Sequence, residues 1–131
     1  STLDHSLYRS KAGTWIQTNV LKHIAHVRKS GRVNEIRALK IWRQLHSLDF
    51  PSFYLELAVI RALSGRWSNQ LADNVLTVLD FFANNLTNAR IVDPANTNNI
   101  VSDDLTVAEK RSIANQAKLS ESMAYWSQVL W

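Results

Sequence analysis

Apolar residues recur three to four positions apart along most of this chain, which is the period of an α-helix. The pattern predicts helices over about residues 14–30, 34–46, 51–64, 68–86 and 107–130. We expect Asn34 and Ser68 to cap two of them, because their side chains can accept a hydrogen bond from the first helical turn. Thr106 and Glu109 have the spacing of a capping box, which predicts the start of the last helix.

The third predicted helix differs from the others because it is apolar on nearly every side. A helix of this kind is typical of the middle of a bundle, so we expect it to be surrounded by the other helices. Glu56 is the exception within it. An unpaired carboxylate is costly to bury, and we therefore expect Glu56 to pair with a basic group of a neighbouring helix.

Between Thr87 and Thr106 the helical pattern stops and the chain becomes rich in Asn and Asp. Asp93-Pro94 is a turn signal in this loop, and the apolar residues near 90–101 indicate a short extended segment. The predicted fold class is all-α, a compact bundle of about five helices with this one long loop. We expect one domain over residues 1–131, with a leading segment 1–13 that has no periodic pattern.

Composition removes several classes of protein. The chain has 131 residues and no cysteine, which excludes disulfides and cysteine-bound zinc. No stretch approaches the roughly 20 apolar residues of a membrane span, so we expect no membrane partner and a cytoplasmic location. The sequence opens at Ser1 without a methionine, which favours either a piece of a longer protein or a processed chain.

Candidate chemistry is sparse. The three glycines are scattered, so there is no glycine-rich phosphate loop, and no G-x-S-x-G turn or D-x-D carboxylate pair occurs. His23 and His26 have a spacing that can share a metal, but no further ligand has informative spacing. We therefore expect no catalytic residue, no metal site and no cofactor in this chain.

Basic residues are unevenly distributed. The net charge is +4, and from Arg9 to Arg43 the only acidic residue is Glu35. Within this stretch Lys40 is accompanied by Arg37 and Arg43, which we regard as candidate phosphate or nucleic-acid contacts. The next helix begins with Pro51, Ser52 and Phe53. Its first N–H groups and the hydroxyl suit an anion, and the phenylalanine ring offers a flat face to a base.

Three motifs resemble one family. They are L-K-I-W from Leu39 to Trp42, P-S-F-Y-L-E-L from Pro51 to Leu57, and I-V-D-P-A-N-T-N-N-I-V from Ile91 to Val101. Their order and separations resemble the carboxy-terminal helical lobe of the oligoadenylate-synthase and bacterial CD-NTase nucleotidyltransferases, and more distantly that of poly(A) polymerases. The likeness covers about residues 14–125.

The resemblance implies a role for each matching residue. Lys40 matches a lysine that contacts the donor phosphates, and Ser52 matches a polar contact. Phe53 stands where the family commonly has a tyrosine that stacks on the base. Glu56 matches a structural glutamate. The residues that match a loop shaping the site are Asp93, Pro94 and Asn99, with Asn96 in place of a more usual acid.

The resemblance also implies what this chain lacks. In such enzymes an amino-terminal lobe carries the catalytic carboxylates and binds Mg or Mn, and the helical lobe closes over a nucleoside triphosphate. This sequence has no counterpart of that lobe. We therefore expect the second lobe of a longer, template-independent nucleotidyltransferase that makes oligonucleotide or cyclic nucleotide products, and that is not catalytic alone.

Two other functions stay open on the sequence. The basic stretch from Arg9 to Arg43 fits a helical module that binds RNA or DNA, with a steep dependence on salt. Alternatively, the chain is a protein-interaction bundle whose tryptophans serve the core and a docking surface. These tryptophans are Trp15, Trp42, Trp67, Trp126 and Trp131.

Overall fold

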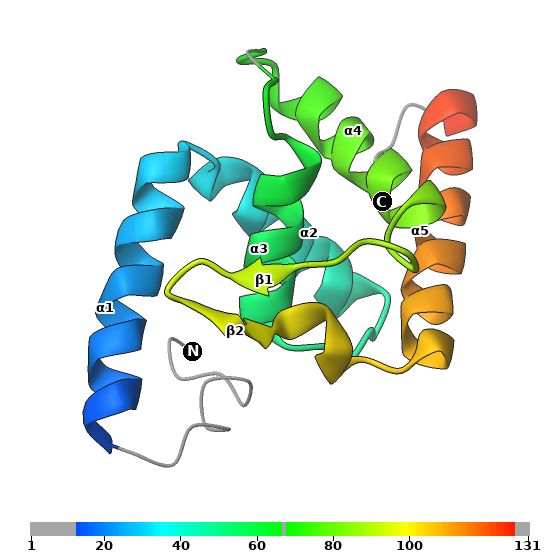
Figure 1. Ribbon diagram of the computed structural model, residues 1–131. Coiled ribbons are helices and arrows are strands. Elements are labelled where there is room, and N and C mark those ends of the chain that lie inside the picture. Colours follow the sequence, from blue (N-terminus) through cyan, green and yellow to red (C-terminus); the bar gives the residue numbers. More distant parts are fainter. Residues whose placement is uncertain (1–12, 67, 128–131) are drawn as a thin grey trace.

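The computed structural model describes residues 13–66 and 68–127, with side chains from residue 21 to residue 123. Figure 1 shows mostly helices with a small hairpin. The helices are α1 (Gly13–Ser30), α2 (Val33–Leu45), α3 (Ser52–Ala62), α4 (Leu71–Asn84) and α5 (Val107–Ser127). The hairpin is β1 (Val92–Asp93) with β2 (Asn96–Ile100), followed by the 3₁₀ turn η2 (Val101–Asp104). The predicted helical bundle is confirmed.

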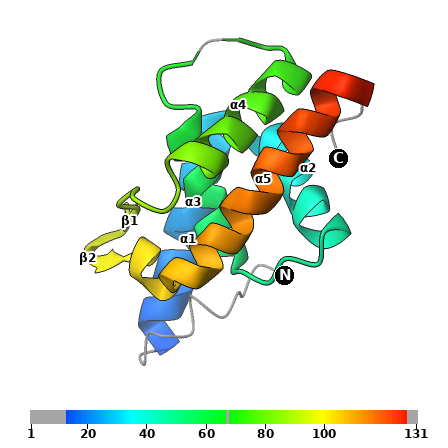
Figure 2. The ribbon, with the colours of Figure 1, turned by 90° about the vertical axis from the view of Figure 1, so that its right-hand side faces the viewer.

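Helix α3 lies in the middle, as its apolar sequence predicts. Tyr54, Leu55, Ala58 and Val59 of this helix are fully buried. Helices α2 and α4 pack against it, α1 stands along one side, and α5 lies across α4 and α2 (Figures 1 and 2). Among the described residues, every helix is too short or too polar to span a lipid bilayer.

The Asn/Asp-rich loop forms a hairpin that reaches towards α1 in front of α3 (Figure 1). Asp93 pairs with Asn96 across a turn that contains Pro94, and Val92 pairs with Ile100, so β2 carries extra residues in an irregular register. The base of the hairpin is fixed by Ser102, which bonds the backbone of Ile91 in both directions. The predicted extended segment and its turn are therefore confirmed.

Only one of the three predicted helix starts is confirmed. Thr106 and Glu109 form the predicted capping box, each side chain accepting from the other residue's backbone N–H. The predictions for Asn34 and Ser68 are wrong. Asn34 lies inside α2, and α4 begins only at Leu71. The Ser68 hydroxyl instead accepts from the backbone of Gln70, which makes a turn ahead of the helix.

Two apolar stripes end earlier than their spacing predicts. Leu45 at the end of α2 is 59% exposed and Met123 in α5 is 50% exposed, so neither belongs to the core. The leading segment 1–12 and the side chains of Trp15, Trp67, Trp126 and Trp131 lie outside the described residues.

Tyr54 combines complete burial with an unused hydroxyl. Its ring packs edge-on against Phe50 in the core, and its hydroxyl has no hydrogen-bond partner among the described residues. Because a buried polar group without a partner is destabilising, we expect Tyr54→Phe to leave stability unchanged or to raise it by up to about 1 kcal/mol. Urea unfolding of both proteins measures this. A loss above about 1 kcal/mol would show that the hydroxyl has a partner after all.

Helices α4 and α5 bring two acids together. Partial burial of Glu121, with repulsion from and a hydrogen bond to Asp80, raises the pKa of Glu121 above its ordinary value of 4.5. A raised carboxyl pKa means that the folded state favours the protonated form, so this contribution to stability is present at acid pH and is lost as pH rises through the folded pKa.

We therefore expect Glu121→Gln to stabilise the protein by a few tenths of a kcal/mol at neutral pH, the scale of exposed charge pairs. The gain should vanish near pH 3, where the wild-type carboxyl is itself protonated. Thermal unfolding at the two pH values measures both effects. A gain that does not depend on pH would contradict the assigned cause.

Candidate active site

The lysine and the serine singled out by the sequence lie on one interface, between α2 and α3. The two helices run antiparallel, so a contact near the end of one meets the start of the other. Lys40 Nζ lies 2.9 Å from Glu56 Oε2. One turn further along α2, Arg43 Nη2 donates to Ser52 Oγ over 2.9 Å. The structure thus brings Lys40, Arg43, Ser52 and Glu56 into one cluster.

Glu56 is the centre of this cluster, and its predicted pairing with a neighbouring helix is confirmed. Its second oxygen, Oε1, lies 2.6 Å from His23 Nε2 of α1, so the carboxylate joins three helices. Burial alone would raise the pKa of Glu56. Hydrogen bonds from His23 and Lys40, and attraction to these groups, outweigh burial and lower it below 4.5. Glu56 is therefore ionised at neutral pH.

The Lys40 side chain is bonded to Glu56 but remains partly open to solvent. It is 34% exposed, about twice the exposed fraction of the Glu56 side chain at 16%. A lysine has a flexible stem, so the ammonium group can reach an anion in solvent while remaining beside Glu56. This combination of a fixed position and an accessible charge suits a phosphate contact.

Arg43 organises the start of α3. Besides Ser52, it bonds the carbonyl of Phe50 over 2.6 Å, and its guanidinium lies 5.5 Å from the centre of the Phe50 ring. Pro51 precedes the helix and supplies no side-chain cap, so the dipole of α3 adds positive potential beside Arg43. Arg37, one turn before Lys40, is exposed on the surface of α2.

Phe53 is not placed as the sequence predicts. It is 2% exposed, and its ring and the His23 ring meet in an edge-to-face arrangement with the centroids 4.5 Å apart. Its apolar ring is more stable in the core than in water, and packing against α1 closes it off. The ring therefore has no open face for a base in this arrangement, contrary to the prediction that it would stack on one.

The hairpin residues form a separate group. Asp93 is buried, and its two oxygens accept from the backbone N–H of Ala95 and, over 3.4 Å, from the amide of Asn99. Pro94 lies at the exposed turn. These contacts shape the hairpin. Its neighbour on α1 is His26, whose pKa is lowered by burial and by nearby His23 against a smaller opposing effect of Asp93.

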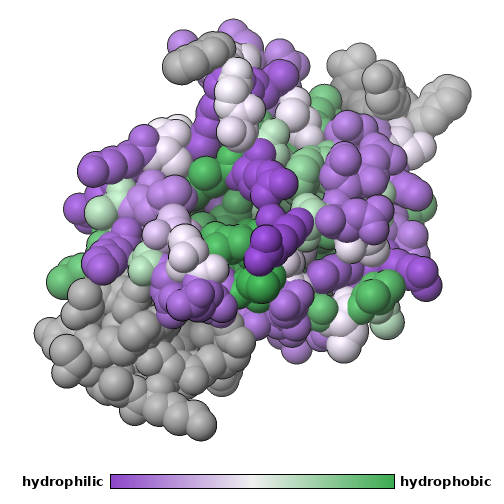
Figure 3. Space-filling model, in the orientation of Figure 1, coloured by the Kyte–Doolittle hydropathy of each residue, from purple (hydrophilic) through white to green (hydrophobic). Residues whose placement is uncertain are grey.

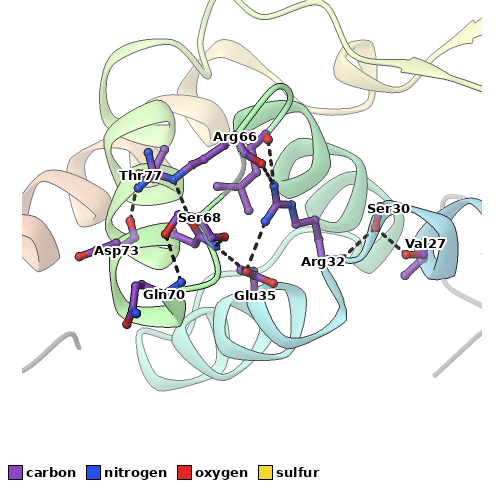
Figure 4. Close-up of polar contacts among 11 residues, drawn as sticks. Val27, Ser30, Arg32, Glu35, Arg66, Ser68, Gln70, Asp73 and Thr77 are labelled. Atoms are coloured by element: carbon purple, nitrogen blue, oxygen red, sulfur yellow. Dashed lines mark hydrogen bonds and ion pairs between the residues drawn. The ribbon is translucent and has the colours of Figure 1, made fainter.

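A buried polar network above this interface was missed by sequence reasoning (Figure 4). Asn74 of α4 donates to Glu35 of α2 over 2.8 Å and to the carbonyl of Ser68 over 3.0 Å, and it accepts from Arg66 over 2.7 Å. Arg32 completes the network through Glu35 and the backbone of Arg66. The sequence feature that could have indicated this network is Asn74, because it is a polar residue among the inward-facing apolar residues of α4.

Within residues 13–66 and 68–127, no three His, Asp or Glu side chains are grouped so that they could hold a metal ion. Comparison with models of protein families, with curated proteins and with solved structures finds no match for this chain.

Proposed function

We propose that the interface of α2 and α3 contacts the phosphates of a nucleoside triphosphate, and that the chain serves as the second, non-catalytic lobe of a template-independent nucleotidyltransferase. The observation that carries the proposal is that Lys40 and Arg43, one turn apart on α2, contact the first two turns of α3. Arg43 bonds Ser52, which supplies a hydroxyl at the helix start, and Lys40 bonds Glu56 one turn further on. The resemblance to oligoadenylate-synthase and CD-NTase lobes supports it, because Lys40 matches the family's phosphate-contacting lysine and Ser52 matches a polar contact.

Charge favours a phosphate over other ligands at this place. Two cations lie along the first two turns of α3, Arg43 at its start and Lys40 one turn further on, and the carboxylate of Glu56 is already shared by Lys40 and His23. A polyphosphate would add charge-assisted hydrogen bonds to Lys40 and Arg43. The proposal concerns phosphates only, since the buried ring of Phe53 gives no support for a base contact.

The proposal predicts weak binding of Mg-ATP to this chain, with chemical-shift changes in the backbone amides of Lys40, Ser52 and Phe53. Lys40→Met keeps the stem and removes the charge, and we expect it to weaken binding by about tenfold, the value of one charge-assisted contact. Lys40→Arg should restore most of the affinity. An NMR titration at low salt measures all three.

Lys118→Met is the matched control, because it removes an exposed lysine from α5, on another part of the surface. If Lys118→Met weakened Mg-ATP binding as much as Lys40→Met, the affinity would depend only on net charge, and the proposal would be overturned. Amide shifts confined to other surfaces would overturn it as well. Tighter binding of single-stranded DNA than of ATP, with a steep salt slope, would favour the nucleic-acid module instead.

A further inference from the structure

A hollow lies on the face formed by α1, α3 and the hairpin. It has a volume of about 240 Å³. Leu57 and Ile91 form its buried floor, and Ile60 and Val92 are half-exposed walls. Figure 3 shows apolar atoms at the bottom of a depression in the middle of this face, with hydrophilic side chains around it.

The size and lining of this hollow limit what it can hold. Pockets for drug-sized ligands occupy about 300–1,000 Å³, so this one accommodates a single side chain or ring. Its apolar lining is aliphatic, and His26 is its only aromatic ring in the described part of the chain. Proteins that bind nucleic acid without sequence preference stack the bases on aromatic side chains. Because the apolar lining of this hollow is aliphatic, it favours an aliphatic side chain over a base as the occupant.

The rim of the hollow is positive. Arg61 lines it and is exposed, and one of its nitrogens is anchored on the carbonyl of Arg90 over 2.8 Å. Lys22 and Lys29 lie about one turn before and after His26 on α1, and both are exposed. An anchored guanidinium is a good partner for a carboxylate, because less freedom is lost when the bond forms.

No exposed acid offsets this charge on the described parts of the three elements. Helix α1 has no acidic residue, Glu56 of α3 is shared between Lys40 and His23, and Asp93 of the hairpin is buried in hydrogen bonds. The surface therefore presents an apolar hollow with the cation of Arg61 on its rim and two exposed lysines on the adjoining helix α1. Complementary charge around an apolar centre is the pattern of a specific protein interface.

We propose that this hollow is a docking site for an acidic peptide segment of a partner protein, which inserts one large aliphatic side chain between α3 and the hairpin while flanking carboxylates bind Arg61, Lys22 and Lys29. This site is distinct from the phosphate site at Lys40. It does not depend on the proposed nucleotide function.

The test uses a synthetic peptide in which one leucine stands between two runs of glutamate. Titrated into the isotope-labelled chain, it should shift the amide resonances of Ile60, Ile91 and Val92. Replacing its leucine by alanine should weaken binding by about tenfold, because the hollow then stays unfilled. Arg61→Glu and Lys29→Glu should each weaken binding by about tenfold by reversing a rim charge.

Arg111→Glu provides the matched control, since it reverses an exposed charge on α5 away from the hollow, and it should change the affinity less than about twofold. Lys40→Met should leave peptide binding unchanged, which separates this site from the phosphate site. The proposal is overturned if the alanine peptide binds as well as the leucine peptide, or if Arg111→Glu matches Arg61→Glu. Displacement of the peptide by oligothymidylate with the same amide shifts would assign the face to nucleic acid instead.

Discussion

Asn74→Ala is expected to destabilise the fold by about 3 kcal/mol, because it removes three hydrogen bonds from a fully buried position, two of them to charged groups. Among the described residues Glu35 then keeps only Arg32, whose Nη1 lies 3.7 Å from it, and its buried carboxylate becomes the main source of the loss. Urea unfolding monitored by tryptophan fluorescence and circular dichroism measures the change.

Asn84→Ala is the control for this prediction. Asn84 lies on the same helix but is exposed, and its side chain bonds only to Asp80 among the described residues. We expect it to change stability by no more than about 0.5 kcal/mol, as is usual for surface positions. A similar loss in both variants would mean that α4 merely tolerates alanine poorly, and the Asn74 network would then have no special importance.

For Glu56→Gln, we expect a loss of about 2 kcal/mol at neutral pH. The change removes the charge that Lys40 and His23 share, and buried hydrogen bonds to a charged group are worth more than neutral ones. The loss stays below that of a fully buried ion pair because water reaches the Lys40 side chain.

The pH dependence of this loss has a definite sign. The folded-state pKa of Glu56 is lowered, so its stabilising contribution is complete above 4.5 and is lost as pH falls through the folded pKa. The stability gap between wild type and Glu56→Gln should therefore shrink steadily below pH 4.5.

Unfolding of both proteins at several pH values from 7 down to 3 measures the difference in their free energy of unfolding. Asp103→Asn is the control, because it makes the same kind of change at an exposed carboxylate in η2. It should alter stability by no more than about 0.5 kcal/mol at any pH. If the gap between wild type and Glu56→Gln stayed constant down to pH 3, the shared ion pair would not be its origin.

Local sequence patterns were sufficient for the helices and for part of the site. The apolar period placed five helices, the all-apolar third one was central, and Asp93-Pro94 marked the turn of the hairpin. A charge within an apolar helix was enough to require a partner for Glu56. These features are set within one or two helical turns, where spacing alone determines which side chains share a face.

Partner identity depended on the tertiary structure. His23 is 33 positions from Glu56 in sequence and Asn74 is 39 positions from Glu35, so no local pattern could pair them. The position of Phe53 could not be predicted from the sequence either. Its spacing fits both a core residue and a residue that stacks on a base, and packing against α1 placed it in the core. Which segments are helical and which charges need partners could be predicted from local patterns alone. Which partners meet and which rings are buried depends on distances between helices that are remote along the chain, so these features followed from the packing.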